Sequence, residues 1–441
     1  MEVFIKIAQF FLSLSILVIL HELGHFIFAK LFHTRVEKFY LFFNPWFSLF
    51  KFKKGETEYG MGWLPLGGYV KISGMIDESM DREQMKKTPE PWEFRSKPAW
   101  QRLLIMLGGV LVNFVLALVI YVMVLYVWGE EYLPVENVKY GILVDSVGNE
   151  MGLQTGDYIV SVDDEKVDNF FHIIPDIVLN ERKTIQVERD GKLLNLEIPY
   201  RVIPDLIKGK GDIHPRFPFH PFVINGYTTN SPAKAAGVQV GDTLVSVDGQ
   251  EFMYYDIFQD YLENRDKDST VHLLLKRNGT FHQVTLSFNE DKKIGIERDL
   301  SHIFEFKHLR YGFLESVPAG IKKGFKTLSD YLKQFKLIFS PGTKAYESVG
   351  GFITIGNIFP GTWEWRSFWT MTAFLSIILA FMNILPIPAL DGGHVMFLLY
   401  EVVTGRKPGD KFLEYAQITG MIILLALLIF ANGNDIIKLF K

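Results

Sequence analysis

The sequence contains no cysteine among its 441 residues. Disulfide bonds are therefore excluded, and so are thiolate metal ligands, which leaves His, Asp and Glu as the side chains for any metal site. The absence of cysteine does not decide the redox compartment. The chain also has no excess of positive charge, since 46 Lys and Arg residues stand against 50 Asp and Glu residues and give a formal net charge of −4. That balance gives no reason to expect a nucleic-acid partner.

Hydrophobic residues are abundant, at 48% of the chain with 38 Phe, and the mean hydropathy of +0.14 suggests membrane segments. A helix that crosses a bilayer needs about 20 mostly apolar residues. Four segments meet that requirement, at 4–31, 103–127, 368–390 and 413–431. The first begins like a signal peptide, with Lys6 before an apolar core, but no small-residue cleavage site follows it. We therefore expect this segment to be retained.

Basic residues set the expected orientation of these segments. They cluster between the first and second segments and again between the third and fourth. Because both connections fall on the same side of a four-span protein, the positive-inside rule makes that side cytoplasmic. Both termini and the long central region are then expected outside the cytoplasm. The residues concerned are Arg35, Lys38, Lys51, Lys53, Lys54, Arg95, Lys97 and Arg102 in the first connection and Arg406, Lys407 and Lys411 in the second.

The first apolar segment carries the motif His21-Glu22-Leu23-Gly24-His25. Residues four apart lie on one face of a helix, so His21 and His25 can share a zinc ion, and Glu22 projects beside them as a candidate general base. Ionisable groups inside an apolar segment are costly and usually functional. A histidine pair at a helix end, facing a loop, is the structural alternative. The expected orientation places the motif within the membrane, toward its cytoplasmic side.

A third ligand is expected from the other end of the chain. Pro386 and Pro388 must break or bend the helix of the third segment, which lets Asp391 turn inward instead of facing lipid. A carboxylate at this depth needs a partner, and a zinc ion held by His21 and His25 suits it. The alternatives are a solvated Asp391 on a cytoplasmic turn, or His394 as a rival ligand, although a neutral histidine near a helix start is more often structural.

The first connection does not read as an ordinary polar loop. Residues 39–52 are heavily aromatic and suit the bilayer interface. Residues 60–71 read as two short extended pieces around Pro65 and the Gly67-Gly68 turn, which predicts a β-hairpin. It could lie on the surface or re-enter the membrane beside the metal, since non-helical backbone is tolerated at that depth when protein buries it. Residues 77–90 are polar and expected to be exposed.

The central region contains an internal repeat, because residues 152–163 align with residues 237–248 without a gap. Each copy is followed by a helix-like stretch, at 169–180 and 255–264, and then by two strands around a tight turn, Asp190-Gly191 or Asn278-Gly279. Two small β-rich domains are therefore predicted. Beyond them, residues 309–339 show apolar residues at helical spacing with interleaved lysines, which predicts an amphipathic helix on the outer membrane surface.

The two copies resemble PDZ domains, which typically bind an extended peptide as an added strand. The second copy matches better, through Ser231-Pro232-Ala233, Gly241-Asp242 and Asp248-Gly249, whereas the first has Asp164 where the turn glycine is expected. A spacer or steric filter without a ligand is the alternative for each copy. The expected domains are 1–128 with the His-Glu motif, 129–215 and 216–303 as the PDZ-like copies, 304–365 as amphipathic helices and connection, and 366–441 with the third ligand.

Taken together, the motifs resemble the site-2 protease family over almost the whole chain. The matching stretches are His21 to His25, Gly67-Gly-Tyr-Val-Lys71, Asn113-Phe114, the two PDZ-like copies, and Asn383-x-x-Pro-x-Pro-x-x-Asp391-Gly. The resemblance implies one zinc ion on His21, His25 and Asp391, with Glu22 as catalytic base. It also implies substrate contacts from Asn383 and from a membrane re-entrant β-loop that contains Gly67, Gly68 and Tyr69.

Some positions depart from the family pattern. Residues 42–45 read Phe-Phe-Asn-Pro where a Gly-Phe-Gly segment is frequent, and Gly109-Val110 and Gly351-Phe352 stand where a Gly-Pro pair is common. These departures leave the metal motif intact. They leave the loop paths and the substrate preference open.

The expected protein is thus a polytopic α-helical membrane protein with four transmembrane helices, a re-entrant β-hairpin and two tandem PDZ-like domains. The resemblance implies an intramembrane zinc metalloprotease of the bacterial inner membrane, surrounded by the lipid bilayer. Its substrates would be single-span membrane proteins such as a pre-trimmed anti-sigma factor or signal peptide remnants. Two other classes stay open: a membrane-anchored peptide-binding scaffold with a non-catalytic metal site, and a transporter, which the large outer region and only four spans disfavour.

Overall fold

The computed structural model describes residues 1–65, 67–75, 88–211, 213–228, 230–266, 268–289, 293–299 and 303–440. Most of the polar segment expected at 77–90 lies outside these ranges. The chain divides into two compact units. The helical unit comprises residues 1–130, 310–339 and 346–441, and the repeat unit comprises residues 131–309 and 340–345.

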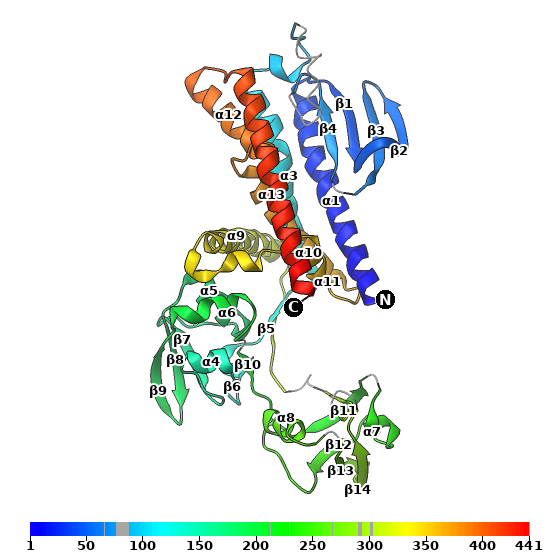
Figure 1. The fold of residues 1–441 in the computed structure, drawn as a ribbon, viewed down its shortest axis with the longest axis vertical. Coiled ribbons are helices and arrows are strands. Elements are labelled where there is room, and N and C mark those ends of the chain that lie inside the picture. Colours follow the sequence, from blue (N-terminus) through cyan, green and yellow to red (C-terminus); the bar gives the residue numbers. More distant parts are fainter. Residues whose placement is uncertain are drawn as a thin grey trace. The chain divides into compact units, whose positions relative to one another are not determined.

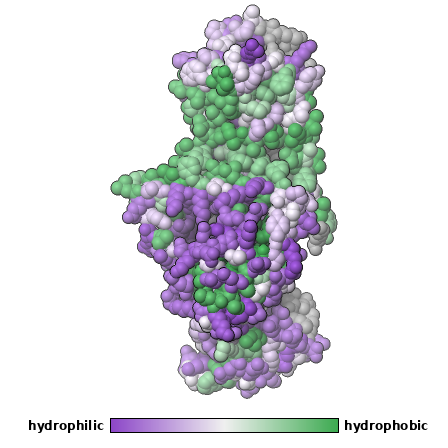
Figure 2. Space-filling view, turned by 90° about the vertical axis from the view of Figure 1, so that its left-hand side faces the viewer, coloured by the Kyte–Doolittle hydropathy of each residue, from purple (hydrophilic) through white to green (hydrophobic). Residues whose placement is uncertain are grey.

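Four helices of the helical unit are long and apolar enough to cross a membrane, which confirms the four predicted segments. They are α1 (Glu2–Leu31), α3 (Ala99–Trp128), α11 (Trp365–Ile384) and α13 (Asp410–Leu439). Figure 1 shows both chain ends at one end of this unit, with the connections from α1 to α3 and from α11 to α13 at the other. Figure 2 shows a hydrophobic band across the visible face of the unit with hydrophilic residues above it, as a bilayer requires.

Helix α3 packs against α1, α11, α12 (Asp391–Thr404) and α9 (Phe313–Ile338). Its approach to α1 is very close, because a Cβ atom on Gly24 would lie 2.2 Å from the carbonyl oxygen of Gly108. Small residues let helix backbones meet in this way inside a membrane. Buried polar contacts add to the packing, including a 3.0 Å hydrogen bond from the Thr372 hydroxyl to that of Ser13.

The third predicted segment was wrong at its end, since α11 stops at Ile384 and not at residue 390. Proline lacks an N–H and forces the preceding residue out of the helical region, so Leu385 before Pro386 is extended (φ −58°, ψ 141°). The predicted break is thereby confirmed. The chain then turns through residues 385–390 and starts α12 at Asp391.

Helix α13 is tied at its C-terminal end to the short helix α10 (Phe352–Asn357). The buried Asp435 carboxylate accepts hydrogen bonds of 3.0 Å from the backbone N–H groups of Ile353 and Thr354. It therefore supplies partners to N–H groups that the first turn of α10 leaves unpaired. Nearer its start, α13 meets the 385–390 turn, where a Cβ atom on Gly420 would overlap the Pro388 carbonyl oxygen.

A four-stranded sheet lies between α1 and α3 in sequence. Its strands are β1 (Val36–Leu41), β2 (Phe43–Lys54), β3 (Thr57–Leu64) and β4 (Tyr69–Ile72), in the order β2-β3-β1-β4. The hairpin predicted at 60–71 was wrong in its pairing, because β1 lies between β3, to which it is parallel, and β4. The Gly67-Gly68 turn reverses the chain locally, but burial of Val36 and Tyr40 decides which strand takes the centre. The actual hairpin joins β2 and β3.

The sheet is anchored on the C-terminal half of α1. The ring of Phe26 packs against Phe39 of β1 at 5.5 Å and against Tyr59 of β3 at 6.1 Å. Ala29 of α1 and Val36 of β1 also belong to a buried cluster with Ile72 of β4. This packing holds β4, an edge strand, next to the helix that carries the His-Glu motif. The aromatic segment expected at a membrane interface forms β1 and β2, and its Trp46 is 90% exposed.

The repeat unit contains both predicted copies. The first has the sheet β7-β8-β9 and helix α5, and the second has the sheet β14-β13-β12-β11-β15 and helix α8. The predicted helices are confirmed, and so are the tight turns, whose Asp190, Gly191, Asn278 and Gly279 all have positive φ. The strands are β5 (Glu130–Tyr132), β6 (Ile142–Leu143), β7 (Tyr158–Val162), β8 (Thr184–Arg189), β9 (Lys192–Glu197), β10 (His214–Pro215), β11 (Phe222–Tyr227), β12 (Thr243–Val247), β13 (Thr270–Arg277), β14 (Thr280–Ser287), β15 (Ile296–Arg298) and β16 (Lys307–Leu309); the helices are α4 (Ser146–Glu150), α5 (Ile173–Asn180), α6 (Ile203–Ile207), α7 (Pro232–Ala235) and α8 (Tyr255–Glu263).

Both copies keep the same ion pair at the same place. The guanidinium of Arg189 makes two 2.7 Å hydrogen bonds to Asp157, and that of Arg277 makes two of 2.7 Å to Asp242. Asp157 and Asp242 are both 1% exposed, and the Arg277 guanidinium lowers the pKa of Asp242. The sequence repeat is therefore also a repeat of tertiary contacts.

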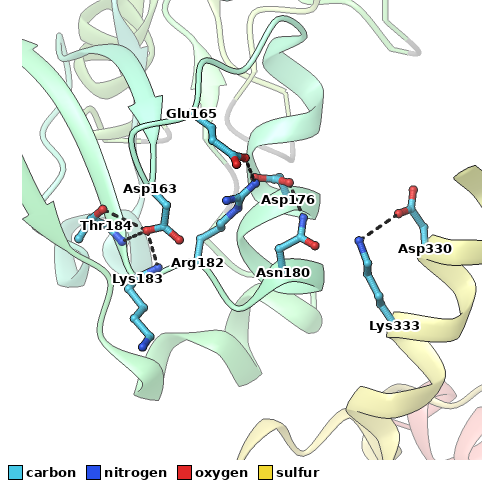
Figure 3. A network of polar contacts seen from close by, with 9 residues as sticks. All are labelled: Asp163, Glu165, Asp176, Asn180, Arg182, Lys183, Thr184, Asp330 and Lys333. Carbon is cyan, nitrogen blue, oxygen red and sulfur yellow. Dashed lines mark hydrogen bonds and ion pairs between the residues drawn. The ribbon is translucent and has the colours of Figure 1, made fainter.

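A second shared contact fixes the strand that follows each helix. Figure 3 shows Asp163 of the first copy accepting hydrogen bonds from the backbone of Lys183 and Thr184. In the second copy, the Asp248 carboxylate accepts a 2.8 Å bond from the His272 backbone. The first copy adds an ion pair of its own between Arg182 and Asp176, at 2.9 Å.

The ion pair of the second copy predicts a local stability effect. Asp242→Asn removes the charge that balances Arg277 and weakens both hydrogen bonds, so we expect the unfolding free energy of the second copy to fall. Hydrogen exchange of the intact protein in detergent would show faster exchange in β12 and β13. Asp260→Asn, on the exposed side of α8, is the matched control. Equal exchange in the two variants would contradict the structural role of the pair.

Candidate metal centre

Three side chains converge beside α3. His21 and His25 lie one turn apart on α1, and their Nε2 atoms are 3.3 Å from each other. The Oδ2 atom of Asp391, at the start of α12, is 3.2 Å from each of these nitrogens. Both histidines are buried, at 8% and 5% exposed. The structure thus brings together the three residues that the sequence analysis singled out as ligands.

The triangle formed by these atoms has the dimensions of a zinc site. Ligands at 2.0–2.1 Å from a tetrahedral zinc ion are about 3.3 Å from one another. The Asp391 Oδ2 atom is buried and has no hydrogen-bond donor among the described residues. A carboxylate oxygen that faces two imidazole nitrogens without a donor needs a cation to balance it. The donor set of two imidazoles and one carboxylate therefore fits zinc with one position left open.

The two imidazoles are oriented from α3. Nδ1 of His25 lies 2.8 Å from the backbone carbonyl oxygen of Ile105, which can only accept a hydrogen bond. Nδ1 of His25 therefore carries the proton, and Nε2 is free to bind a metal. Gly109 lies against both imidazole rings, since a Cβ atom there would be 2.5 Å from His25 Nε2 and from His21 Cε1. The absence of a side chain at this position makes room for both rings.

A cavity of about 450 Å³ opens beside the three side chains. Glu22 lines it, so its carboxylate and the metal position share one space. The whole of β4 forms one wall, and the start of α12 forms another. His394 lines the cavity as well but is not part of the three-residue group. The cavity gives water and an extended peptide room next to the open position.

Two of the four residues predicted to touch substrate line this cavity. Gly68 and Tyr69 line it, and Gly68 packs so closely on α1 that a Cβ atom would be 2.8 Å from Val18 and 3.4 Å from Glu22. Gly67 is not among the lining residues of the described chain and adopts a φ of +148°. The Asn383 amide nitrogen lies 3.4 Å from Nε2 of His21, at the edge of the triangle.

Sequence reasoning gave no individual role to Ile105, Gly109 or Asn113, which meet the two imidazoles from α3. One of them left a signal, since Asn113 is a polar residue in an apolar segment, where polar groups are costly. A backbone carbonyl such as that of Ile105 leaves no trace in the sequence. The tight space at Gly109 depends on where α1 crosses α3, which the sequence does not state.

The sequence also matches a known protein family and several known proteins. The sequence profile of "Peptidase family M50" matches residues 9–427. The Regulator of sigma E protease of Haemophilus influenzae is 27% identical over 98% of this chain and 99% of its own length. Proteins of Borreliella burgdorferi (28% identical, 90% of each chain) and Rickettsia conorii (27% identical, 99% of this chain and all of the relative) are named as zinc metalloproteases.

The close contact at Gly109 predicts that a side chain at this position weakens zinc binding without disrupting helix α3. Gly109→Ala raises helix propensity by about 1 kcal/mol but places a methyl group against both imidazoles. We expect zinc affinity to fall by at least about tenfold, the range seen when metal ligands lose their support. Metal content after dialysis against a zinc buffer would measure it. Gly433→Ala in α13 is the control, because its Cβ meets nothing within 4 Å; similar zinc content in both variants would contradict the prediction.

Proposed function

Because the chain belongs to peptidase family M50, it is a zinc metalloprotease, and we propose that it hydrolyses peptide bonds in or next to transmembrane segments of other membrane proteins. The observation that carries the proposal is the triangle of His21, His25 and Asp391. It is built on helices of a length and hydropathy that suit a multi-pass inner-membrane protein. A metal site at that depth is within reach of a membrane-embedded peptide bond.

We assign His21, His25 and Asp391 as the zinc ligands and Glu22 as the general base. Zinc in such a site lowers the pKa of bound water toward 7 and polarises a carbonyl group. Glu22 takes a proton from the attacking water and passes it to the leaving amine. Its place on the cavity wall beside the ligands supports this role. The Asn383 amide nitrogen lies 3.4 Å from Nε2 of His21. We assign it as a hydrogen-bond donor to the scissile carbonyl oxygen, on which negative charge develops.

We assign β4 as the strand that receives the substrate. A transmembrane helix hides its backbone groups in internal hydrogen bonds, so it must unwind before cleavage, and the freed groups need new partners. β4 pairs with β1 on one side, and no strand of the described chain pairs with its other edge. All four residues of β4 line the cavity that holds Glu22, and Gly68 belongs to the same wall. A substrate strand added there would enter the metal site directly.

The relatives and the repeat unit support a proposal for the substrate class. One relative is named as a regulator of sigma E, which supports a pre-trimmed anti-sigma factor as substrate. Signal peptide remnants share the single-span form and are a second class. We assign the two repeat copies as PDZ-like domains outside the cytoplasm, where they admit trimmed membrane stubs and exclude proteins with bulky outer domains. The positive-inside rule supports this orientation, with both termini outside and the metal site toward the cytoplasmic side.

The role of Glu22 can be separated from metal binding. Glu22→Gln keeps all three ligands and removes only the base, so we expect normal zinc content and cleavage slowed by at least about 100-fold. The assay uses purified protein in detergent with a tagged single-span substrate. Treatment of the wild type with a chelator, followed by zinc, provides the control for metal dependence. Cleavage at the wild-type rate by Glu22→Gln would overturn the assignment of the base.

The filter role predicts a gain of activity. Deleting residues 133–306 should leave cleavage of a pre-trimmed substrate near the wild-type rate, since the metal centre lies wholly in the helical unit. The same deletion should allow cleavage of the untrimmed substrate, measured by gel in the same assay. The deletion combined with Glu22→Gln shows that any new product comes from this active site. Unchanged selectivity would refute the filter.

A further inference from the structure

Asn113 is a fully buried polar residue on α3, at 0% exposed. Its side-chain Nδ2 atom lies 3.1 Å from Nδ1 of His21, on the side of the ring that faces away from Asp391. Its Oδ1 atom is buried and has no hydrogen-bond partner among the described residues. Among the described residues, His21 is thus the one hydrogen-bond partner of the Asn113 amide group.

Metal chemistry decides which end of the amide faces the ring. A neutral imidazole carries its proton on one nitrogen, and a nitrogen that binds zinc must be the other one. If Nε2 of His21 binds the metal, its Nδ1 carries the proton and is a hydrogen-bond donor. The Asn113 Nδ2 atom, 3.1 Å away, is also a donor, so the two groups could not form a hydrogen bond. The oxygen and nitrogen of an amide exchange places by a half-turn that leaves its shape unchanged. After that turn, Oδ1 accepts the hydrogen bond from Nδ1–H of His21.

We propose that Asn113 is a positioning residue for the metal centre, whose Oδ1 accepts the Nδ1–H of His21 and so fixes the tautomer that binds zinc. Its role matches that of the Ile105 carbonyl oxygen, which accepts from Nδ1–H of His25 at 2.8 Å. Ile105, Gly109 and Asn113 are spaced by four residues and share one face of α3. That face thus presents two hydrogen-bond acceptors, at Ile105 and Asn113, with space for both imidazole rings at Gly109 between them. Ser376 steadies it through a 2.7 Å hydrogen bond to the Asn113 backbone carbonyl.

The inference rests on the proposed zinc ligands and predicts a change in metal affinity that does not depend on turnover. Loss of a group that orients a metal-binding histidine weakens metal binding by about 10- to 100-fold. Asn113→Leu keeps a similar shape and removes the acceptor, so it should show that loss. Asn113→Asp keeps an acceptor at the same place and should bind zinc within about threefold of the wild type, since either protonation state of a carboxyl group retains an accepting oxygen.

The test is zinc affinity of the full-length protein in detergent, measured by competition with a chromophoric chelator. Weak binding by Asn113→Leu with near-normal binding by Asn113→Asp supports the proposal. Wild-type affinity in Asn113→Leu, or equal losses in both variants, overturns it. Thr372→Val is the matched control, because it removes a fully buried polar group, the Thr372 hydroxyl, from the same helical unit without touching His21.

A variant of the ligand itself separates this proposal from the one on which it rests. His21→Ala should abolish tight zinc binding. If His21→Ala binds zinc as the wild type does, the proposed ligand set is wrong. If His21→Ala loses zinc while Asn113→Leu keeps it, the ligand set stands and only the role of Asn113 falls. Thermal unfolding of each variant, compared with Thr372→Val, shows whether any loss reflects misfolding.

Discussion

The metal centre depends on how closely two helices approach each other. Gly24 on α1 and Gly108 on α3 bring the two backbones into contact, and the adjacent Gly109 leaves space for the two imidazoles. In a bilayer the hydrophobic effect does not drive helices together, so this contact comes from close packing of small residues and from buried hydrogen bonds. Were α1 further away, neither His21 nor His25 could reach the acceptors on α3. The position of the rings is therefore a property of the helix crossing as much as of the motif.

Asp391, the third proposed ligand, reaches the two histidines for a different reason. An unbroken α11 would have carried its backbone past the imidazole pair, and a carboxylate on it would face lipid or a neighbouring helix. Pro386 and Pro388 end the helix early, and the turn that follows sets Asp391 at the first position of α12. The N-terminus of a helix favours a negative charge, so this placement also suits the carboxylate before any metal binds. A backbone break thus serves both geometry and electrostatics.

Much of this could be read from the sequence, and the omissions have physical causes. Length and hydropathy predicted the four apolar helices, and the repeat of residues 152–163 at 237–248 predicted two similar β-rich domains. The Asp–Arg contact that the two copies share was not predicted. The spacing of His21 and His25 and the depth of Asp391 predicted that they would meet. The parallel pairing of β1 with β3 was missed, because strand order follows from burial of residues far apart in the chain. The acceptor at Ile105 was missed because a backbone carbonyl is present at every position.

The length of β4 has a mechanical consequence. The strand has four residues, which is about one turn of a helix. Four residues rise about 6 Å in a helix and about 13 Å in a strand, so a substrate that exchanges one form for the other lengthens by about 7 Å. Neighbouring parts of the substrate chain must therefore move by this distance. A transmembrane segment with a folded domain at each end cannot move in this way. A segment with an unfolded end can move freely toward the strand.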